Sequence, residues 1–460
     1  MNAVFVIVGG GIAGVSCAET LAYLQPDKSI ILLSESTLIK TVTNLHAITK
    51  TIVSFDIEEA SSSSLSDKHK NVTVVRDTMT EVKDDQYFIT TKSGLNIKYS
   101  YLCLCMGAEP KLIPQSLELP DYIIGIRDTD SAESFIGKLK NCSKILVVGN
   151  GGIASEIVYK IINTEVAWVV RDNHISATFV DPGAAEFFQD MLKKDGVLTE
   201  ITSKRMRYQE EDTLKSGAAL GPDWYMNLLM SGCAKKNVCV HYKCEVASVS
   251  LMQEQNHPLE VSLTNGQKIF CDLIVSATGV SPRTNFQTAK KLDIALDEGI
   301  KVDQYMKTNL DKIYAAGDIC SANWDLAKHW FQMKLWTQAR QMGCYAAKCM
   351  SGDLNKEQIL QDFCFEIFTH STKLFGYKVI LLGLYNGQKL DNKYEVLLRT
   401  TKGMEYIKFI IQDHKLQGAV LIGETDLEEM CENLVLNQIN LEPYGDDILN
   451  PDIDIEDYFD

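Results

Sequence analysis

Apolar residues follow the same arrangement twice along the chain, each time as a short strand followed by a helix. An apolar run over residues 4–8 leads into a glycine turn, and apolar residues then recur at helical spacing at Ile12, Val15, Ala18, Leu21 and Ala22. The arrangement returns at residues 144–148, with helical spacing at Ile153, Ile157 and Ile161. Strands that alternate with helices predict parallel sheets, so we expect an α/β protein with two Rossmann-like domains.

The pattern changes near residue 363. Apolar and polar residues alternate over 363–367, and apolar runs follow at residues 379–382, 394–398, 406–411 and 419–422, which predicts an antiparallel sheet. Thr425 and Glu428 have the spacing of a capping box, which predicts a helix after the last strand. A further helix is expected over about 330–350. The C-terminal part should therefore be an α+β domain.

The first turn has the spacing of a dinucleotide-binding loop. Gly9, Gly11 and Gly14, with Ile12 and Ala13 between them, form a GxGxxG sequence between a strand and a helix. The first glycine permits the turn, the second lets a pyrophosphate approach, and the third lets the helix pack on its strand. The alternative is an ordinary glycine-rich turn. The next strand, 30–33, should end in an acid for the ribose; Glu35 is the candidate, unless Ser34 takes the strand end.

A second loop of this kind strengthens the interpretation. It begins at Gly149 and continues through Gly151, Gly152 and Ile153, with Glu156 in the helix that follows. Ala154 in the third position still allows close packing. Two such loops in one chain predict two dinucleotides, FAD beside NAD(P)H. Two short strands end in Gly279 and in Gly317-Asp318; taken alone, each fits an ordinary core strand and turn.

Composition narrows the function further. The 460 residues suggest two or three domains, and the net charge of −16 disfavours direct binding to nucleic acid. No apolar run approaches the roughly 20 residues of a membrane-spanning helix. A strand almost at the start leaves no room for a leader peptide, so we expect a reducing compartment. The 13 cysteines have neither zinc nor disulfide-ladder spacing, and no metal site is expected.

The four glycine motifs, in the order in which they follow one another, resemble those of the pyridine nucleotide-disulphide oxidoreductases. The resemblance covers about residues 1–355. The resemblance implies an FAD site at Gly9, Gly11, Gly14, Gly107 and Asp318, and an NAD(P)H site at Gly149, Gly151 and Glu156, with Gly279 at the crossover between domains. It divides the chain into an FAD-binding domain (1–138 and 274–355), an NAD(P)H-binding domain (139–273) and a C-terminal interface domain (356–460).

The cysteine pair that gives this family its name is missing. The loop where such enzymes carry it, residues 40–46, contains no cysteine. Electrons should therefore stop at the flavin or pass directly to a diffusible acceptor. Cys103 and Cys105 are better explained as small buried residues than as a replacement pair. In some thiol-free relatives a lysine of this loop lies by the flavin N5 and pairs with a glutamate, which makes Lys40, with Asn44, a flavin-edge candidate; the alternative is a surface lysine.

Arg171 and Asp172 follow the strand after the second loop, where the adenosine ribose should lie. Arginine suits a 2′-phosphate and aspartate suits ribose hydroxyls; we favour NADH slightly, because no second arginine follows within 173–177. The possible acceptors include a quinone, a small electron-transfer protein and oxygen. A redox sensor or scaffold without turnover is the alternative from another class. The sequence does not predict the oligomeric state.

A closer resemblance spans essentially the whole chain. The segments 217–224, 335–343 and 422–429 and the acidic tail from Gly445 resemble one group of animal proteins within this family. It implies a nuclear and cytoplasmic protein that associates with the tRNA-splicing ligase and protects it from oxidation. An insertion at about 200–236, rich in lysine and arginine at its ends, is either a contact site or a solvated loop, and the tail either docks on a partner or on its own body, or is solvated.

Overall fold

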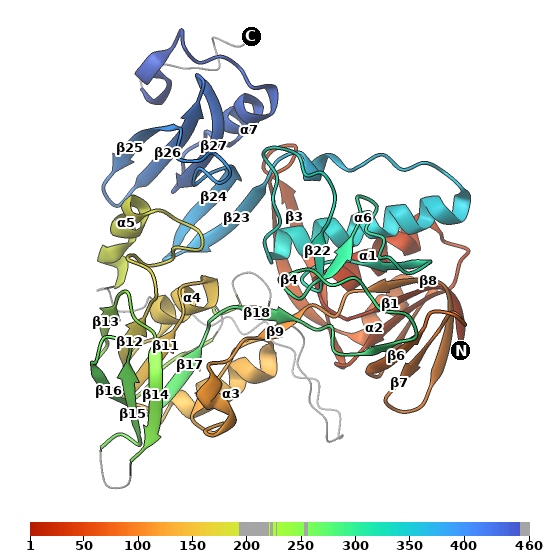
Figure 1. The fold of residues 1–460 in the computed structure, drawn as a ribbon, viewed down its shortest axis with the longest axis horizontal. Helices are drawn as coiled ribbons and strands as arrows, with labels where there is room; N and C mark the ends of the chain where they lie inside the picture. The colour runs from red at the N-terminus through yellow and green to blue at the C-terminus, as the bar shows by residue number, and fades with distance from the viewer. Residues whose placement is uncertain (193–219, 221–223, 227, 253–255, 451–460) are drawn as a thin grey trace.

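The computed structural model describes residues 1–192, 220, 224–226, 228–252 and 256–450. The acidic tail beyond 450 and most of the insertion at 200–236 lie outside the described residues. Figure 1 shows three bodies: a first α/β body on one side, and a second α/β body with a C-terminal sheet above it on the other. The mixed parallel sheets confirm the predicted fold class. Within the described residues, no helix is both long and apolar enough to cross a membrane.

The first body is built around a sheet with the strand order β19-β6-β7-β8-β1-β2-β5, and β21 pairs with β8. Its strands are β1 (Asn2–Val8), β2 (Ile30–Ser34), β5 (Val72–Arg76), β6 (Met79–Lys83), β7 (Phe88–Thr91), β8 (Asn96–Leu104), β19 (Gln287–Thr288) and β21 (Ile313–Ala315). Helices α1 (Ile12–Leu24) and α6 (Trp336–Asn355) cover one face, and α2 (Ser62–Lys68) lies beside β5. Two strand pairs complete the body, β3 (Leu38–Ala47) with β4 (Val53–Ser61) and β20 (Ile300–Val302) with β22 (Cys320–Ala322).

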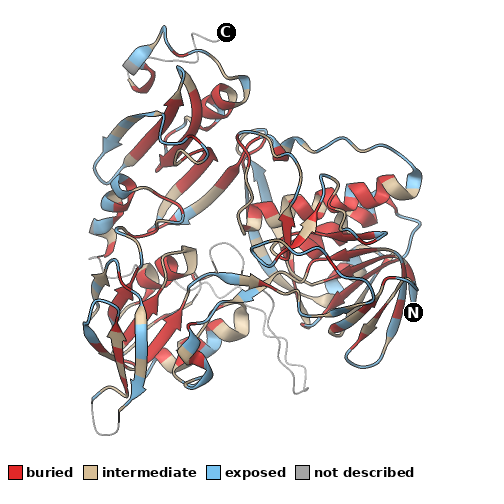
Figure 2. Ribbon diagram, in the orientation of Figure 1, coloured by how far each residue is buried: buried red, intermediate tan, exposed pale blue. Residues whose placement is uncertain are grey.

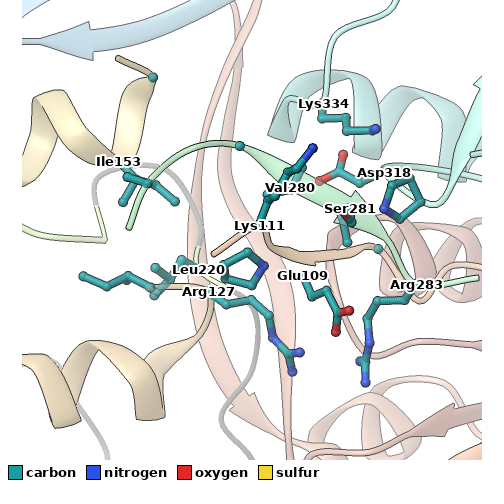
Figure 3. Close-up of a pocket in the computed structure, with 18 of the residues that line it drawn as sticks. Glu109, Lys111, Arg127, Ile153, Leu220, Val280, Ser281, Arg283, Asp318 and Lys334 are labelled. Atoms are coloured by element: carbon teal, nitrogen blue, oxygen red, sulfur yellow. The ribbon is translucent and has the colours of Figure 1, made fainter. Parts of the chain in front are cut away.

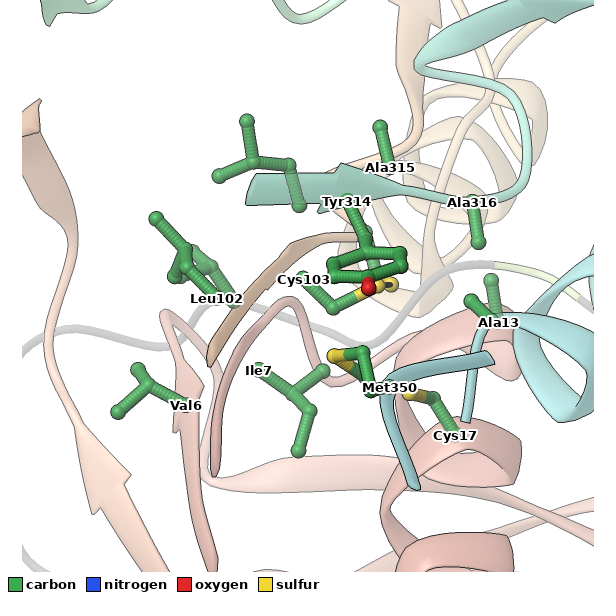
Figure 4. Packing of buried hydrophobic residues seen from close by; sticks show 14 of the residues in the cluster. Val6, Ile7, Ala13, Cys17, Leu102, Cys103, Tyr314, Ala315, Ala316 and Met350 are labelled. Atoms are coloured by element: carbon green, nitrogen blue, oxygen red, sulfur yellow. Dashed lines mark hydrogen bonds between the residues drawn. The ribbon is translucent and has the colours of Figure 1, made fainter. Parts of the chain in front are cut away.

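The centre of this body is apolar, since the inner strands β1 and β2 consist largely of buried apolar residues. Figure 2 shows the inner strands and most of α1 buried, while loops, outer strands and the ends of helices carry the exposed residues. Figure 4 shows Cys17 of α1, Cys103 of β8, Tyr314 of β21 and Met350 of α6 in one cluster. These four residues therefore share one core, although the whole second body lies between residues 103 and 314 in the sequence.

The second body has a parallel sheet with the order β10-β17-β11-β12-β13. Its strands are β10 (Ile123–Ile124), β11 (Lys144–Val148), β12 (Glu165–Val169), β13 (Asn237–His241) and β17 (Leu273–Ser276), and its helices are α3 (Thr129–Leu139), α4 (Gly152–Lys160) and α5 (Pro182–Leu192). A smaller antiparallel sheet contains β14 (Val246–Leu251), β15 (Leu259–Leu263) and β16 (Lys268–Cys271).

The second body is larger than the sequence-based division, 139–273, predicts. Strand β10 pairs with β17, and Ala132, Phe135 and Leu139 of α3 belong to its core. Residues 123–139 join this body because β10 adds an edge strand to the parallel sheet. Two chain crossings link it to the first body: β9 (Ala108–Pro110) and β18 (Val280–Pro282), which pair antiparallel, with the short 3-10 helix η1 (Pro114–Leu117) after the first.

The C-terminal body is an antiparallel sheet with the order β23-β24-β27-β26-β25. It contains β23 (Thr369–Leu374), β24 (Tyr377–Gly383), β25 (Glu395–Thr401), β26 (Glu405–Gln412), β27 (Lys415–Ile422), α7 (Glu428–Asn437) and the 3-10 helices η2 (Phe363–Phe365) and η3 (Gly445–Leu449). Helix α7 packs on β27 and β24.

Three local predictions were wrong. Residues 363–365 form η2 instead of a strand, because the Asp362 carboxylate accepts from the Cys364 N–H at 3.2 Å and turns the chain. The predicted helix at 330–350 begins only at Trp336, since the chain before it is not helical and packs Trp330 into the core of the first body. The capping box is not formed either: α7 begins after Leu427 without a side-chain cap, and the Thr425 hydroxyl has no hydrogen-bond partner.

A largely buried ion pair joins the C-terminal body to the second body. Lys408 of β26, 5% exposed, donates to Asp181 at 2.6 Å, and Asp181 precedes α5 and accepts from the backbone of Gly183 at 2.9 Å. The Tyr406 hydroxyl donates to the same carboxylate at 2.9 Å. Burial opposes ionisation of Asp181, but Lys408 and these donors prevail and lower its pKa below the usual value.

We expect Lys408→Met to weaken this junction by about 2–4 kcal/mol, because it leaves a carboxylate that is only 22% exposed without its cation. Thermal unfolding of the variant should show a lower midpoint. Lys268→Met is the control, since Lys268 pairs with Glu260 while 60% exposed and should change stability by less than about 1 kcal/mol. Because the folded pKa of Asp181 is depressed, its contribution should be present above the unfolded pKa and lost as the pH falls below about 4. Equal midpoints for the two variants would contradict this account.

Candidate functional site

A cavity of about 1440 Å³ lies between the first and second bodies and contacts both glycine loops. Pockets for a single drug-sized ligand usually measure about 300–1,000 Å³, so this cavity is large enough for two extended ligands. Figure 3 shows that the crossing strand β18 passes through it, with Ile153 of α4 on one side and Asp318 on the other.

The first glycine loop has the geometry of a pyrophosphate cradle. Gly9 adopts a φ of +124°, and a Cβ there would lie 2.2 Å from the carbonyl oxygen of Cys105. A Cβ on Gly14 would lie 1.9 Å from the Gly9 carbonyl oxygen. Gly11 differs, because no protein atom lies within 4 Å of its Cβ position and the residue lines the cavity. A side chain at Gly11 would therefore occupy ligand space and leave the protein packing intact.

The second loop repeats this geometry. Gly149 has a φ of +126°, and a Cβ there would lie 2.0 Å from the Ala277 carbonyl oxygen, whereas the Cβ position of Gly151 is open to 4 Å. Ala154 replaces the third glycine and is fully buried. The repeated geometry makes two equivalent cradles on opposite sides of one cavity.

Both helices that follow these loops have uncapped N-termini. Gly11 precedes α1 and Gly151 precedes α4, and neither helix has a side-chain cap or an acidic residue in its first turn. The first N–H groups of a helix have no partner within the helix and favour an anion. Together with the open space at Gly11 and Gly151, these free donors fit two pyrophosphates, so the residues present fit FAD and NAD(P)H.

Two carboxylates lie where the sequence predicts polar contacts to a dinucleotide. Glu35 follows β2, lines the cavity and accepts from Arg283 at 3.1 Å. Asp318 follows β21 and lines the cavity near Lys334 (Figure 3). Burial raises the pKa of Asp318 to about 6, with Lys334 acting in the opposite direction. Hydroxyl groups that donate hydrogen bonds to this carboxylate would stabilise its charged form.

The structure brings most of the predicted site residues to this cavity. Those in its lining are Gly9, Gly11, Ile12, Ala13, Glu35, Gly107, Gly149, Gly151, Gly152, Ile153, Glu156, Arg171, Gly279 and Asp318. Gly14 and Gly317 lie outside the lining and act in packing; a Cβ on Gly317 would lie 2.8 Å from the Cβ of Ala13.

Lys40 and Asn44 of β3 are also outside the lining. Lys40 is 5% exposed and its ammonium lies 3.0 Å from Glu59, so the alternative of a surface lysine is wrong. Asn44 donates to Asp56 at 2.7 Å. A role for either residue at the flavin edge stays a prediction.

The cysteines near the cavity are not arranged for a thiol relay. All 13 cysteines are free, and Cys105 in the lining lies 3.5 Å from Cys103, Sγ to Sγ. The hydrogen bond with Cys103 and burial together raise the pKa of Cys105 well above its usual value. Since the thiolate is the reactive form, the raised pKa disfavours reaction of this thiol.

Several polar and aromatic residues of the lining come from segments that no sequence motif marks. They are Glu109, Lys111, Phe179, Arg283, Lys334 and His370. His370 of β23 is 1% exposed, stacks on Phe179 with ring centroids 6.3 Å apart, and has its pKa lowered to about 4 by burial. The C-terminal body thus contributes directly to the site, although the sequence predicts only an interface domain there.

The two side chains that follow β12, Arg171 and Asp172, differ in how accessible they are to a bound ribose. The Asp172 carboxylate accepts from the Asn150 amide at 2.8 Å, whereas Arg171 is exposed at the cavity. We therefore expect Arg171→Ala to weaken NADPH binding roughly tenfold and to leave NADH binding unchanged, since only a 2′-phosphate would pair with the guanidinium. Dissociation constants for both nucleotides check this. An equal loss for both would show that Arg171 does not read the 2′ position.

Comparisons with known proteins agree with this geometry. Residues 4–221 and 226–343 match the family described as pyridine nucleotide-disulphide oxidoreductase. The chain is 49% identical over 470 residues to a Drosophila melanogaster protein named pyridine nucleotide-disulfide oxidoreductase domain-containing protein 1, with 99% of each chain covered. The Homo sapiens protein of the same name is 46% identical over 491 residues, with 99% of this chain and 98% of that protein covered.

Among solved structures, the covalent putidaredoxin reductase-putidaredoxin complex is similar, with a TM-score of 0.68, 16% identity and coverage of 96% of this chain and 94% of that one. This likeness shows the shared fold. Together with the two cradles, the sequence matches place the chain in the general class of NAD(P)H-dependent flavoprotein oxidoreductases. The chain belongs to the pyridine nucleotide-disulphide oxidoreductase family.

Proposed function

We propose that this chain takes hydride from NAD(P)H, with NADH favoured, and passes the electrons from FAD directly to an acceptor without a cysteine pair. The observation that carries the proposal is the single cavity into which both glycine cradles open. The absence of cysteine from residues 40–46 and the raised pKa of Cys105 support the direct route.

The protein's part in this reaction is binding and alignment. Bound FAD supplies the hydride acceptor, and NAD(P)H supplies the hydride. The uncapped N-termini of α1 and α4 hold one pyrophosphate each, and Glu35 and Asp318 accept hydrogen bonds from hydroxyl groups. Phe179, Leu335 and Ile153 provide apolar wall that excludes water. No side chain is required as a general base, so alignment accounts for the catalysis.

Anaerobic stopped-flow measurements on the FAD-loaded protein test this proposal. NADH should bleach the flavin absorbance, and mixing the reduced protein with oxygen, a quinone or a ferredoxin should reveal which acceptor restores it. Fast reoxidation by one of them supports an oxidoreductase. A long-lived charge-transfer band that no acceptor removes would favour a redox sensor or scaffold, and a flavin that NADH cannot bleach would overturn the proposal.

We further propose that the chain associates with the tRNA-splicing ligase, in nucleus and cytoplasm, and protects it from oxidation. The proposal rests on the resemblance of the whole chain to one group of animal proteins, which implies this partner, and the net charge of −16 suits a protein partner better than RNA. Ligase treated with peroxide should keep more activity in the presence of the wild-type protein and NADH than with the Gly151→Val variant. Equal loss in both mixtures would contradict this role.

A further inference from the structure

Leu220 forms hydrogen bonds with both α/β bodies at the junction between them. Its backbone N–H donates to the Arg127 carbonyl at 3.0 Å, and its own carbonyl accepts from the indole N–H of Trp336 at 3.1 Å. Arg127 precedes α3 of the second body, whereas Trp336 is the first residue of α6 in the first body. Leu220 lies in the cavity wall, as Figure 3 shows. Part of the insertion at about 200–236 is therefore built into the site.

Trp224 connects the same insertion to the second glycine loop. Its indole N–H donates to the Glu156 carboxylate at 2.7 Å. Glu156 lies one turn into α4 and is only 5% exposed, so its charge depends on donors that replace water. The Trp224 ring meets that of the buried Tyr225 edge-on, with centroids 6.1 Å apart. The indole is thus held by packing as well as by its hydrogen bond.

The position of this contact indicates which part of a dinucleotide it would meet. Trp224 and Glu156 both line the cavity, together with Trp336 from the first body. Arg171 lies instead at the end of β12, where the adenosine ribose is expected. The hydrogen bond between Leu220 and Trp336 places Leu220 at the side where the two bodies meet. Two dinucleotides in facing cradles would bring their reacting ends together on that side.

We propose that Leu220 and Trp224 are part of the NAD(P)H subsite, and that Trp224 is a positioning residue which fixes the Glu156 carboxylate for the polar groups of the nicotinamide half. This inference rests on the proposed function. Leu220 then forms part of the wall of the nucleotide site and Trp224 positions one of its carboxylates, a role that the sequence alone does not predict for these residues. Because the carboxylate is held before the nucleotide arrives, binding does not have to order it.

Trp224→Phe tests the proposal, because it keeps an aromatic ring and removes the N–H donor. Calorimetry on the oxidised, FAD-loaded protein should show NAD⁺ binding about tenfold weaker than in the wild type, with the affinity for ADP-ribose unchanged, since ADP-ribose lacks the nicotinamide. Glu156→Gln should show the same selectivity. The double variant should be no worse than the poorer single variant, because Trp224 acts through Glu156.

Trp324→Phe is the matched control, since Trp324 is half-buried, stacks on Trp330 with centroids 5.6 Å apart and lies outside the cavity lining. Its affinities should equal those of the wild type. Trp224→His, which keeps a ring N–H, should recover part of the NAD⁺ affinity. Unchanged NAD⁺ binding in Trp224→Phe, equal losses for NAD⁺ and ADP-ribose, or additive losses in the double variant would each overturn the inference. If the wild type itself binds neither nucleotide, the proposed function fails instead.

Discussion

The Gly11→Val variant is expected to purify folded but colourless. The Cβ of the valine would meet no protein atom within 4 Å apart from its chain neighbours, so the side chain would project into the cavity and take the space of the FAD pyrophosphate. The backbone tolerates valine, because Gly11 has a φ of −80° and an extended conformation. Losing one or two charge-assisted hydrogen bonds, at about 1.5–3 kcal/mol each, should weaken FAD binding by about 100-fold or more.

The ratio of flavin to protein absorbance after purification, followed by titration with added FAD, measures this effect. Gly137→Val provides the control, because Gly137 is an exposed residue of α3 whose Cβ position is also open. That variant should stay yellow. A yellow Gly11→Val protein with normal FAD affinity would show that the first cradle does not hold the flavin nucleotide.

The Gly151→Val variant should remain yellow yet resist bleaching by NADH. Its Cβ position is equally open and its φ is −93°, so the substitution blocks the second cradle and leaves the first one intact. NADH binding should weaken by about 100-fold, for the same loss of hydrogen bonds to phosphate. Stopped-flow absorbance measures the bleaching rate as a function of NADH concentration.

Dithionite should still reduce the flavin of Gly151→Val, since it does not need the nucleotide subsite. A colourless Gly151→Val protein would mean that the two cradles had been assigned to the wrong nucleotides. Normal bleaching at low NADH concentration would mean that the second cradle is not used for the hydride donor. The pair of variants therefore tests the assignment of each loop separately.

The two cradles could be predicted from sequence because each is a local structure. A strand, a glycine turn and a helix follow one another within about twenty residues, and the residues that carry the geometry are neighbours in the chain. Glu35 could be predicted for the same reason, since the strand that precedes it pairs directly with β1. Asp318 follows a strand that joins the first sheet through β8, and its Gly-Asp sequence marks that strand end.

Contacts between distant segments could not be predicted in this way. Arg283 reaches Glu35 across 248 positions in the chain, and Trp224 reaches Glu156 across 68. His370 enters the cavity only because the C-terminal sheet packs against the second body. Neither residue spacing nor apolar periodicity carries information about which bodies come together. The start of α6 could not be predicted for a related reason, because Trp330 and Leu335 are buried by tertiary packing and not on a helix face.

The split first body has a consequence for how the protein is made. Strand β21 and helix α6 complete its core, and Gly343 of α6 approaches α1 so closely that a Cβ would lie 2.2 Å from the Ala13 carbonyl oxygen. A ribosome has therefore translated about three quarters of the message before α1 can meet its partner helix. The intervening body can fold on the emerging chain first, and flavin loading has to wait for the later segment.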